Sequence, residues 1–352
     1  MKTRLFLLVT VSLLLACTLT ARAQLTKDVT VAEAGTLASH FTEAELTQVT
    51  NLTVSGPLNG ADILTLRSMS GNLQVLDLEE AQIVGDNRTN IYYRTGSSVF
   101  YTQDGVVGDY MFFGFVTLER IVLPKDVWSI GSWDTDTPWN TDRTEVSGQP
   151  NVTSAEESDS GYPGCATFSR CVNLKEVVFP SSLLWIGPKA FRYCQQLASV
   201  SVPEGVEGIG AYAFSNCANL VSASLPSTLG KRNKLRWSTL EDEWSMRTGN
   251  YFDYIFRDCT ALSEVRLAEG LTVLYRDMFN GCSALTTVEL PQSLERMYSS
   301  FYNCANLESI DLPQGLTYVG AFGGCSSLTS IVIPDGVTSL EGNVFSSCTS
   351  LR

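Results

Sequence analysis

One phrase, F-x-x-C-x-x-L, occurs eight times between Phe168 and Leu351, and this repetition limits the possible folds more than any other feature of the chain. Four of the seven intervals between successive cysteines are 23 residues long. A fixed period of this length is typical of a solenoid, in which each repeat forms one coil and stacks on the next. The cysteines are Cys171, Cys194, Cys217, Cys259, Cys282, Cys304, Cys325 and Cys348.

Each repeat also contains the pattern of a short strand. Counted from the cysteine, leucine stands at position +3, apolar residues stand at +6 and +8, and proline stands at +9 in six of the seven coils long enough to show it. Alternate residues of a strand point to the same side, so we expect +6 and +8 to face inward and +5 and +7 to face outward. Proline lacks the amide proton for the next ladder bond and therefore predicts the end of the strand.

The rest of each coil is too short for a full helix. Apolar residues recur at +12 and usually at +15, glycine often follows, and the next phenylalanine comes a few residues later. We expect short strands here, and a single helical or 3₁₀ turn leading into each phenylalanine. The whole pattern predicts a right-handed solenoid, dominated by β-structure, with a parallel β-sheet and short helical or 3₁₀ turns.

Residues 1–23 have the composition of a secretory signal peptide. Lys2 and Arg4 precede an uncharged run from Leu5 to Cys17, and Ala23 ends an A-x-A cleavage site before Gln24. The uncharged run is too short to span a bilayer, so we expect no membrane span in the mature chain. An alternative interpretation is a lipoprotein signal, in which Cys17 is lipidated.

The mature chain divides into a capping segment and a repeat region. We expect a cap over residues 24–72, with a strand near 52–54 and a helix near 62–69, and a solenoid over residues 73–352. A degenerate coil contains Phe112 and has Phe115 at the cysteine position. Two insertions, residues 131–164 and 230–250, interrupt the period and are expected to be loops on a turn.

The charge and the histidine content argue against several classes of function. Removal of residues 1–23 takes three of the 24 basic residues and no acidic residue, which leaves a formal net charge of −16. So acidic a chain repels nucleic acid and anionic membrane surfaces. With His40 as its one histidine, the chain has little scope for a histidine base or a multi-histidine metal site.

The cysteines allow two interpretations. Nine cysteines in an exported chain can form disulfides, but the number is odd, and equivalent side chains of stacked coils point the same way. Cysteine is also among the most frequently buried residue types. The phenylalanine at the cysteine position of the degenerate coil, Phe115, can fill the same buried space but cannot form a disulfide. We therefore expect a column of buried free thiols, with a ladder of disulfides as the alternative. Pairing of Cys165 with Cys171 stays open.

These motifs together resemble the BspA-like class of leucine-rich repeats, whose units are close to I-G-x-x-A-F-x-x-C-x-x-L-x-x-V-x-L-P. The resemblance covers roughly residues 52–352. It implies a leucine-rich repeat solenoid in a secreted or surface-displayed bacterial protein that acts in adhesion to host matrix proteins, other cells or glycoproteins. It implies no catalytic residues and no cofactor. The two insertions, and an end at Arg352 in the middle of a coil, depart from the family pattern.

Two regions contain candidate binding residues. Positions +5 and +7 form the outward sheet face, which we expect to be concave, and which is either a binding face or an ordinary solvated surface. The insertions contain four of the six tryptophans, which either contact a ligand or hold the loops against the solenoid. The candidates are Glu264, Arg266, Glu289 and Asp311 on the sheet face, and Trp133, Trp139, Arg236, Trp237 and Trp244 in the insertions.

Acidic residues near Asp134, Asp136 and Asp142 have a spacing that suggests calcium, but Pro138 and Trp139 stand where the helix-loop-helix pattern needs a ligand and a glycine. We therefore predict a solvated loop and no metal site. The leading hypothesis is a non-enzymatic binding protein for an extracellular protein or glycoprotein. The alternative is a structural or scaffolding component of the bacterial cell envelope. The sequence makes no prediction about oligomeric state.

Overall fold

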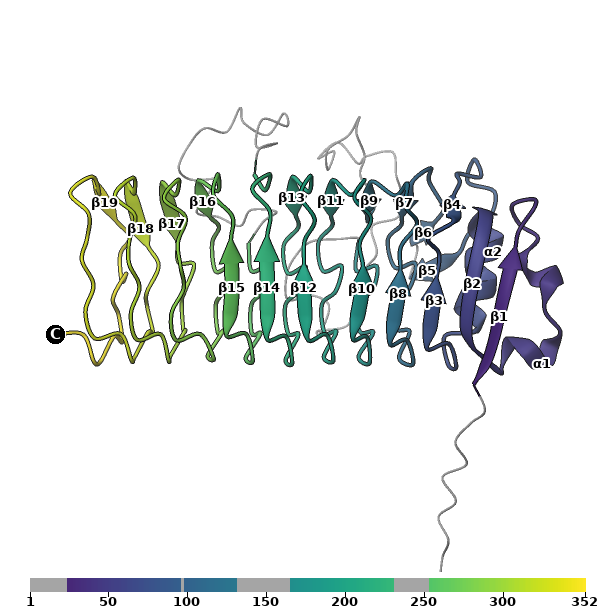
Figure 1. Ribbon diagram of the computed structural model, residues 1–352, viewed down its shortest axis with the longest axis horizontal. Coiled ribbons are helices and arrows are strands. Elements are labelled where there is room, and N and C mark those ends of the chain that lie inside the picture. Colours follow the sequence, from purple (N-terminus) through teal and green to yellow (C-terminus); the bar gives the residue numbers. More distant parts are fainter. Residues whose placement is uncertain (1–23, 96–97, 132–164, 231–252) are drawn as a thin grey trace, which may run out of the picture.

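The computed structural model describes residues 24–95, 98–131, 165–230 and 253–352, which form a row of stacked coils (Figure 1). One side of the row is a parallel sheet that joins the capping segment to the first coils, and a second parallel sheet continues it. The strands of the first sheet are, in order, β1 (Leu25–Thr30), β2 (Val49–Leu58), β3 (Val75–Asp77), β8 (Arg120–Val122) and β10 (Glu176–Val178). Those of the second are β12 (Ser199–Ser201), β14 (Ser222–Leu225) and β15 (Glu264–Leu267).

A second row of strands follows the proline turn in each coil and lies along another edge of the stack (Figure 1). From β9 onward these strands occupy positions +14 to +16 and are two or three residues long. They are β4 (Ala81–Ile83), β7 (Val106–Val107), β9 (Ser129–Ile130), β11 (Trp185–Ile186), β13 (Gly208–Ile209), β16 (Val273–Leu274), β17 (Arg296–Tyr298), β18 (Tyr318–Gly320) and β19 (Ser339–Leu340). The short strands predicted for this part of the coil are therefore present.

The N-terminal segment adds helices and one hairpin. Helix α2 (Gly60–Ser68) covers the predicted helical region, and its neighbours are the 3₁₀ helix η1 (Leu37–His40) and the short helix α1 (Glu43–Leu46). The buried carboxylate of Asp62 in α2 accepts hydrogen bonds from the amides of Gly35 (2.6 Å) and Leu37 (2.8 Å), which ties η1 to α2. The antiparallel hairpin of β5 (Tyr93–Thr95) and β6 (Ser98–Phe100) was not predicted.

The second of these sheets shows the predicted alternation most clearly. In β12 the middle residue, Val200, is buried while Ser199 and Ser201 are exposed, and β14 and β15 follow the same pattern. Neighbouring coils pair in equal positions, since Val200 lies opposite Ala223 and Ala223 opposite Val265. The inward residues therefore form columns that run through the stack.

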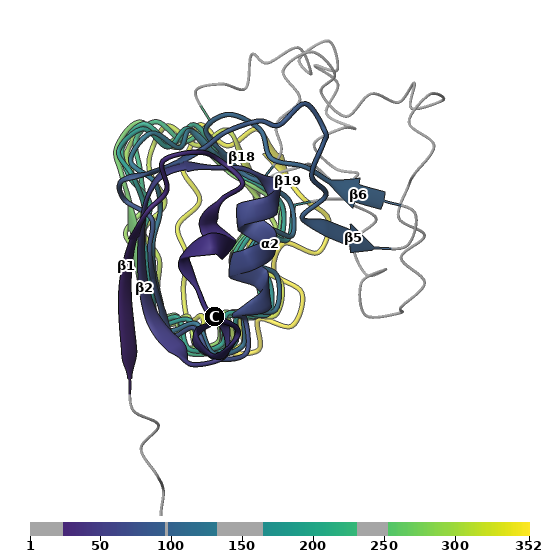
Figure 2. The ribbon, with the colours of Figure 1, turned by 90° about the vertical axis from the view of Figure 1, so that its right-hand side faces the viewer.

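Two predictions about this side of the stack were wrong in part. Beyond β15 the +5 to +8 segments are not strands, although their inward residues Val288, Leu290 and Ile310 stay buried. The coils there shorten to 22 and 21 residues, and the longer strands β17 and β18 in the second row provide the regular pairing instead. The stack is also only slightly curved in Figures 1 and 2, so the face predicted to be concave is shallow.

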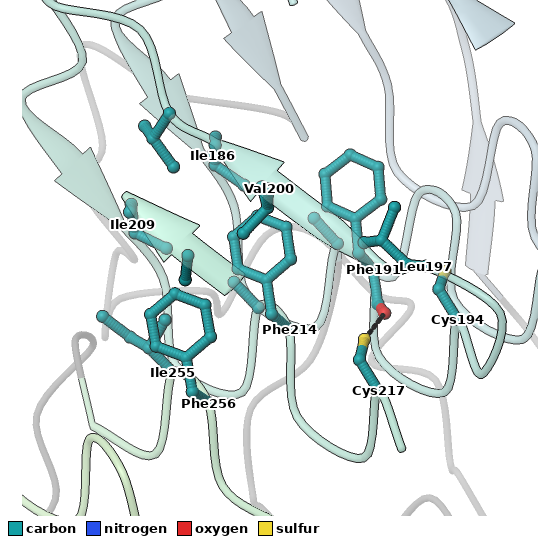
Figure 3. Close-up of a cluster of buried hydrophobic side chains, with 14 of the residues drawn as sticks. Ile186, Phe191, Cys194, Leu197, Val200, Ile209, Phe214, Cys217, Ile255 and Phe256 are labelled. Carbon is teal, nitrogen blue, oxygen red and sulfur yellow. Dashed lines mark hydrogen bonds between the residues drawn. The ribbon is translucent and has the colours of Figure 1, made fainter. Parts of the chain in front are cut away.

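The repeated phenylalanines form one continuous stack of rings inside the solenoid, of which Figure 3 shows Phe191, Phe214 and Phe256. Successive ring centres lie 5.0 to 6.1 Å apart, and the ring planes differ by only 2° to 13°. Parallel rings at this spacing contribute both apolar burial and aromatic contact. The stack consists of Phe112, Phe168, Phe191, Phe214, Phe256, Phe279, Phe301, Phe322 and Phe345.

Backbone hydrogen bonds join the phenylalanine segments of neighbouring coils. The amide of Phe168 donates to the carbonyl of Ala190 (2.7 Å), and the amide of Phe191 donates to the carbonyl of Ala213 (2.7 Å). Within a coil, the amide of Cys194 donates to the carbonyl of Phe191 (3.2 Å), which is the three-residue bond of a 3₁₀ turn. The predicted single turns are therefore present, and each is bonded to the next coil.

The second residue after every stacked phenylalanine has a left-handed backbone, with φ between 59° and 81°. This conformation ends the turn and returns the chain toward the cysteine. Only glycine adopts it without strain, and asparagine and aspartate tolerate it better than other residues. The residues are Gly114, Arg170, Tyr193, Asn216, Asp258, Gly281, Asn303, Gly324 and Ser347.

Each repeat cysteine is a free thiol that bonds to the preceding coil, and all of them except the partly exposed Cys348 are buried. The Sγ of Cys217 donates to the carbonyl of Phe191 at 3.3 Å, and the Sγ of Cys194 donates to that of Phe168 at 3.2 Å (Figure 3). The nine cysteines among the described residues are all free, including Cys165 and Cys171. Phe115 is fully buried at the cysteine position, as expected for packing. The thiol column is confirmed for these residues.

Replacement of Gly281 by alanine should test the left-handed position. Gly281 has a φ of 77°, and an added Cβ would lie 2.5 Å from Oδ1 of Asp258, so we expect the free energy of unfolding to fall by about 1–2 kcal/mol. Urea denaturation would measure it. Gly71→Ala is the control, because nothing lies within 4 Å of its added Cβ, and it should be neutral or stabilising by up to about 1 kcal/mol. Equal effects of the two changes on the free energy of unfolding would contradict the claim that the left-handed position of Gly281 requires glycine.

The buried thiols should resist alkylation in the folded protein. Burial raises the pKa of Cys171 and of Cys325 to about 12, and burial also raises that of the less buried Cys348. Because the thiolate is the nucleophile, labelling with iodoacetamide should be slow even at about pH 10, with Cys348 reacting first. Mass spectrometry before and after unfolding in guanidinium would measure this. Rapid labelling of Cys194 or Cys282 in the native protein would contradict the buried column.

Candidate binding surfaces

The outward side of these two sheets, which we call the sheet face, presents a regular row of polar side chains. In β14 and β12, the hydroxyl of Ser224 donates to that of Ser201 at 3.0 Å. At the N-terminal end of the row, Arg120 in β8 contacts Glu176 in β10 at 2.9 Å. Exposed pairs of this kind contribute little to stability, so the row has few structural constraints on its residue types.

The structure places the four sheet-face candidates on one side of the coils. Glu264 and Arg266 are exposed in β15 and form an ion pair across their own strand, with Arg266 Nη2 2.8 Å from Glu264 Oε1. Glu289 and Asp311 are exposed at position +7 of the next two coils, but they do not lie on strands. The four residues therefore form a mixed-charge end of the sheet face, continuous with the serine-rich part.

The candidates in the insertions cannot be placed in the same way. Trp133, Trp139, Arg236, Trp237 and Trp244 lie outside the described residues, as do the acidic residues considered for calcium. The described chain ends before each insertion at a glycine that bonds to the preceding coil. The amide of Gly131 donates to Val107 O (2.8 Å), and that of Gly230 donates to Glu207 O (2.9 Å). Within the described residues, no cluster of three or more metal-ligating side chains is present.

A second surface, which the sequence did not single out, lies beside the phenylalanine stack. Figure 2 shows that the coils return on the side opposite β1 and β2, where α2 and the β5–β6 hairpin also lie. Tyrosines and arginines alternate there at one or two residues from the phenylalanines. We call this surface the Tyr–Arg strip; it consists of Arg170, Arg192, Tyr193, Tyr212, Tyr254 and Arg257.

Contacts between aromatic rings and guanidinium groups fix the side chains of the strip. Tyr212 and Tyr254 stack with their ring centres 4.7 Å apart and their planes 8° apart. The guanidinium of Arg192 lies 4.8 Å from the ring centre of Tyr193 and 5.5 Å from that of Tyr212, within the range of cation–π attraction. Burial, followed by the nearby carboxylate of Asp277, raises the pKa of Tyr254 to about 12, so its hydroxyl remains protonated at neutral pH.

Comparison with known proteins decides the family. The model of the BspA type leucine-rich repeat region matches six copies, over residues 164–238 and 251–352, which is half of the chain. The chain belongs to this family. BspA type repeat proteins generally bind other proteins and are generally not enzymes, and the family includes bacterial cell-surface proteins. No curated protein matches the chain.

Solved structures similar to this BspA type protein come from several bacteria. A leucine-rich repeat protein of T. pallidum is 26% identical, with a TM-score of 0.40, over 57% of this chain and 71% of that one. One from Eubacterium ventriosum is 16% identical, with a TM-score of 0.42, over 92% and 89%. A leucine-rich cell surface protein of Faecalibacterium prausnitzii is 16% identical, with a TM-score of 0.34, over 85% and 82%.

Among the described residues, no helix is both long enough and apolar enough to cross a membrane.

Proposed function

We propose that this protein is exported and adheres, at the cell surface or after secretion, to an extracellular protein or glycoprotein such as a component of the host matrix. The observation that supports this most directly is the sheet face, where outward side chains repeat at equal positions over successive coils. The buried columns keep these outward positions in register from coil to coil. The face can therefore present polar groups over several coils without loss of folding stability. The family's general role in protein binding agrees with this.

The end of the face around β15 is the part that we propose to contact the ligand. Glu264, Arg266, Glu289 and Asp311 are exposed there and bring charges of both signs into one region. Charged groups at an interface determine orientation and partner choice more than they determine affinity. The serine-rich part on β12 and β14 would provide hydrogen-bonding groups with little loss of side-chain entropy.

Binding of residues 24–352 to immobilised matrix proteins and mucin would test this proposal. Surface plasmon resonance should show saturable binding to at least one of them. If the intact chain binds none, adhesion is excluded, and the alternative of a scaffolding component of the envelope gains support.

A triple change on the sheet face, Glu264→Ala, Glu289→Ala and Asp311→Ala, should weaken that binding about tenfold or more, equivalent to about 1.4 kcal/mol. A matched control removes three exposed acidic residues from the turns that follow the sheet segments, Glu79→Ala, Asp126→Ala and Asp335→Ala, and alters the net charge equally. The control should bind like the unmodified chain. Similar losses in both variants would show a general effect of charge and would contradict a site on the sheet face.

A further inference from the structure

One aromatic residue outside the phenylalanine stack departs from the repeat. The residue directly after the stacked phenylalanine is buried in three consecutive coils, where Ser169, Arg192 and Ser215 are 5%, 7% and 0% exposed. Tyr302 stands at the same position after Phe301 but is 40% exposed. Among the described residues, no other phenylalanine, tyrosine or tryptophan is as exposed. The ring of Tyr302 is therefore a surface group that the packing of the coils does not require.

Two consecutive glycines in the next coil determine where this ring lies. Gly323 and Gly324 follow the stacked phenylalanine of their coil, as Tyr302 and Asn303 do in the coil before. A Cβ atom added to Gly323 would lie 2.6 Å from Cε2 of Tyr302 and 2.8 Å from its Cδ2. One edge of the ring therefore lies against the glycine backbone, in the space that a side chain would otherwise fill.

Polar side chains from the coils on both sides converge on the same two glycines. A Cβ atom added to Gly324 would collide with Oδ1 of Asn303. Oγ of Ser346, from the following coil, lies 3.2 Å from the Cβ position of Gly323. Within the described part of the chain, the hydroxyls of Tyr302 and Ser346 bond to no other residue. An aromatic ring, an amide and two available hydroxyls are thus brought together on one surface.

The polar groups beside the ring are neutral, and the charged group bonded to them is acidic. Nδ2 of Asn303 donates to Oδ1 of Asn280 at 3.5 Å, and Nδ2 of Asn280 donates to the carboxylate of Asp277 at 2.9 Å. The chain as a whole is also strongly acidic. This surface therefore favours a neutral ligand over a sulfated or sialylated one.

We propose that Tyr302, Asn303 and Ser346 form a binding site for a neutral sugar, with a pyranose ring packed against the exposed part of the Tyr302 ring. A pyranose has C–H groups on its faces and hydroxyls around its rim, so it matches an aromatic ring bordered by an amide and hydroxyls. A proline-rich peptide matches less well, because its recognition uses a groove lined by several aromatic residues. The site lies outside the sheet face, so this proposal does not depend on adhesion through that face.

Saturation-transfer difference NMR with residues 24–352 would test the site. The probes are the neutral sugars N-acetyllactosamine, cellotriose and N-acetylchitotriose, compared with sialylated N-acetyllactosamine and a proline-rich peptide. We expect saturation transfer to the C–H protons of at least one neutral sugar, and weaker transfer to the sialylated one. Binding of no neutral sugar, equal binding of the sialylated sugar, or binding of the peptide alone would overturn the proposal.

Two variants and a control would locate the binding. Tyr302→Ala removes the ring and should weaken binding of the neutral sugar about tenfold. Asn303→Asp keeps a residue that tolerates the left-handed backbone but removes the amide, and should weaken binding several-fold. Tyr193→Ala, at another tyrosine beside the phenylalanine stack, is the matched control and should bind normally. Unchanged binding in both site variants, or an equal loss in the control, would overturn the assignment.

Thermal denaturation would show that each variant folds, and Asn303→Asp serves if Tyr302→Ala does not. The triple change on the sheet face should leave sugar binding unchanged, which separates this site from the proposed adhesion site. Loss of sugar binding in that triple variant would place the sugar on the sheet face and would overturn the site at Tyr302.

Discussion

The structure depends on the way in which each coil satisfies the backbone of its neighbour. Around the phenylalanine, one coil donates an amide proton to the next coil and accepts a thiol proton from it, as Phe191 does with Ala213 and Cys217. The phenylalanine carbonyl therefore uses both lone pairs, one within its own turn and one between coils. Cysteine suits this position because it is small, tolerates full burial and still donates a weak hydrogen bond. The F-x-x-C-x-x-L phrase therefore contains the phenylalanine and the cysteine that make these hydrogen bonds between coils.

Because the interior is so constrained, the outside of the solenoid can vary without affecting the fold. Position +5 is serine in β12 and β14 and glutamate in β15, while the buried positions beside it barely change. The same holds beside the phenylalanine stack, where Tyr193, Asn216 and Asp258 occupy equivalent places. Two opposite surfaces, the sheet face and the Tyr–Arg strip, can therefore differ in residue type while the scaffold stays the same.

Alternation and the position of proline were enough to predict the strands from β8 to β15, since they are direct consequences of burial and of lost amide protons. They failed after β15, where the same alternation and the same prolines occur without regular strands, so this pattern fixes the burial of +6 and +8 but not the hydrogen bonds between coils. The left-handed positions were not predicted because arginine, tyrosine and serine occupy several of them, as at Arg170 and Ser347. The strip was missed for a related reason: no single residue type repeats in it, although tyrosine recurs within two residues of Phe191, Phe214 and Phe256.

The central claim is that the phenylalanine segments link the coils into one cooperative unit, and hydrogen exchange of their amides tests it most directly. The amides of Phe191, Phe214, Phe256 and Phe279 all donate to the following coil. The account predicts that they are strongly protected and exchange with free energies within about 1 kcal/mol of one another, because they open together. Exchange as fast as in exposed loops, or free energies that differ by several kcal/mol between adjacent coils, would show that the coils open separately and would contradict it.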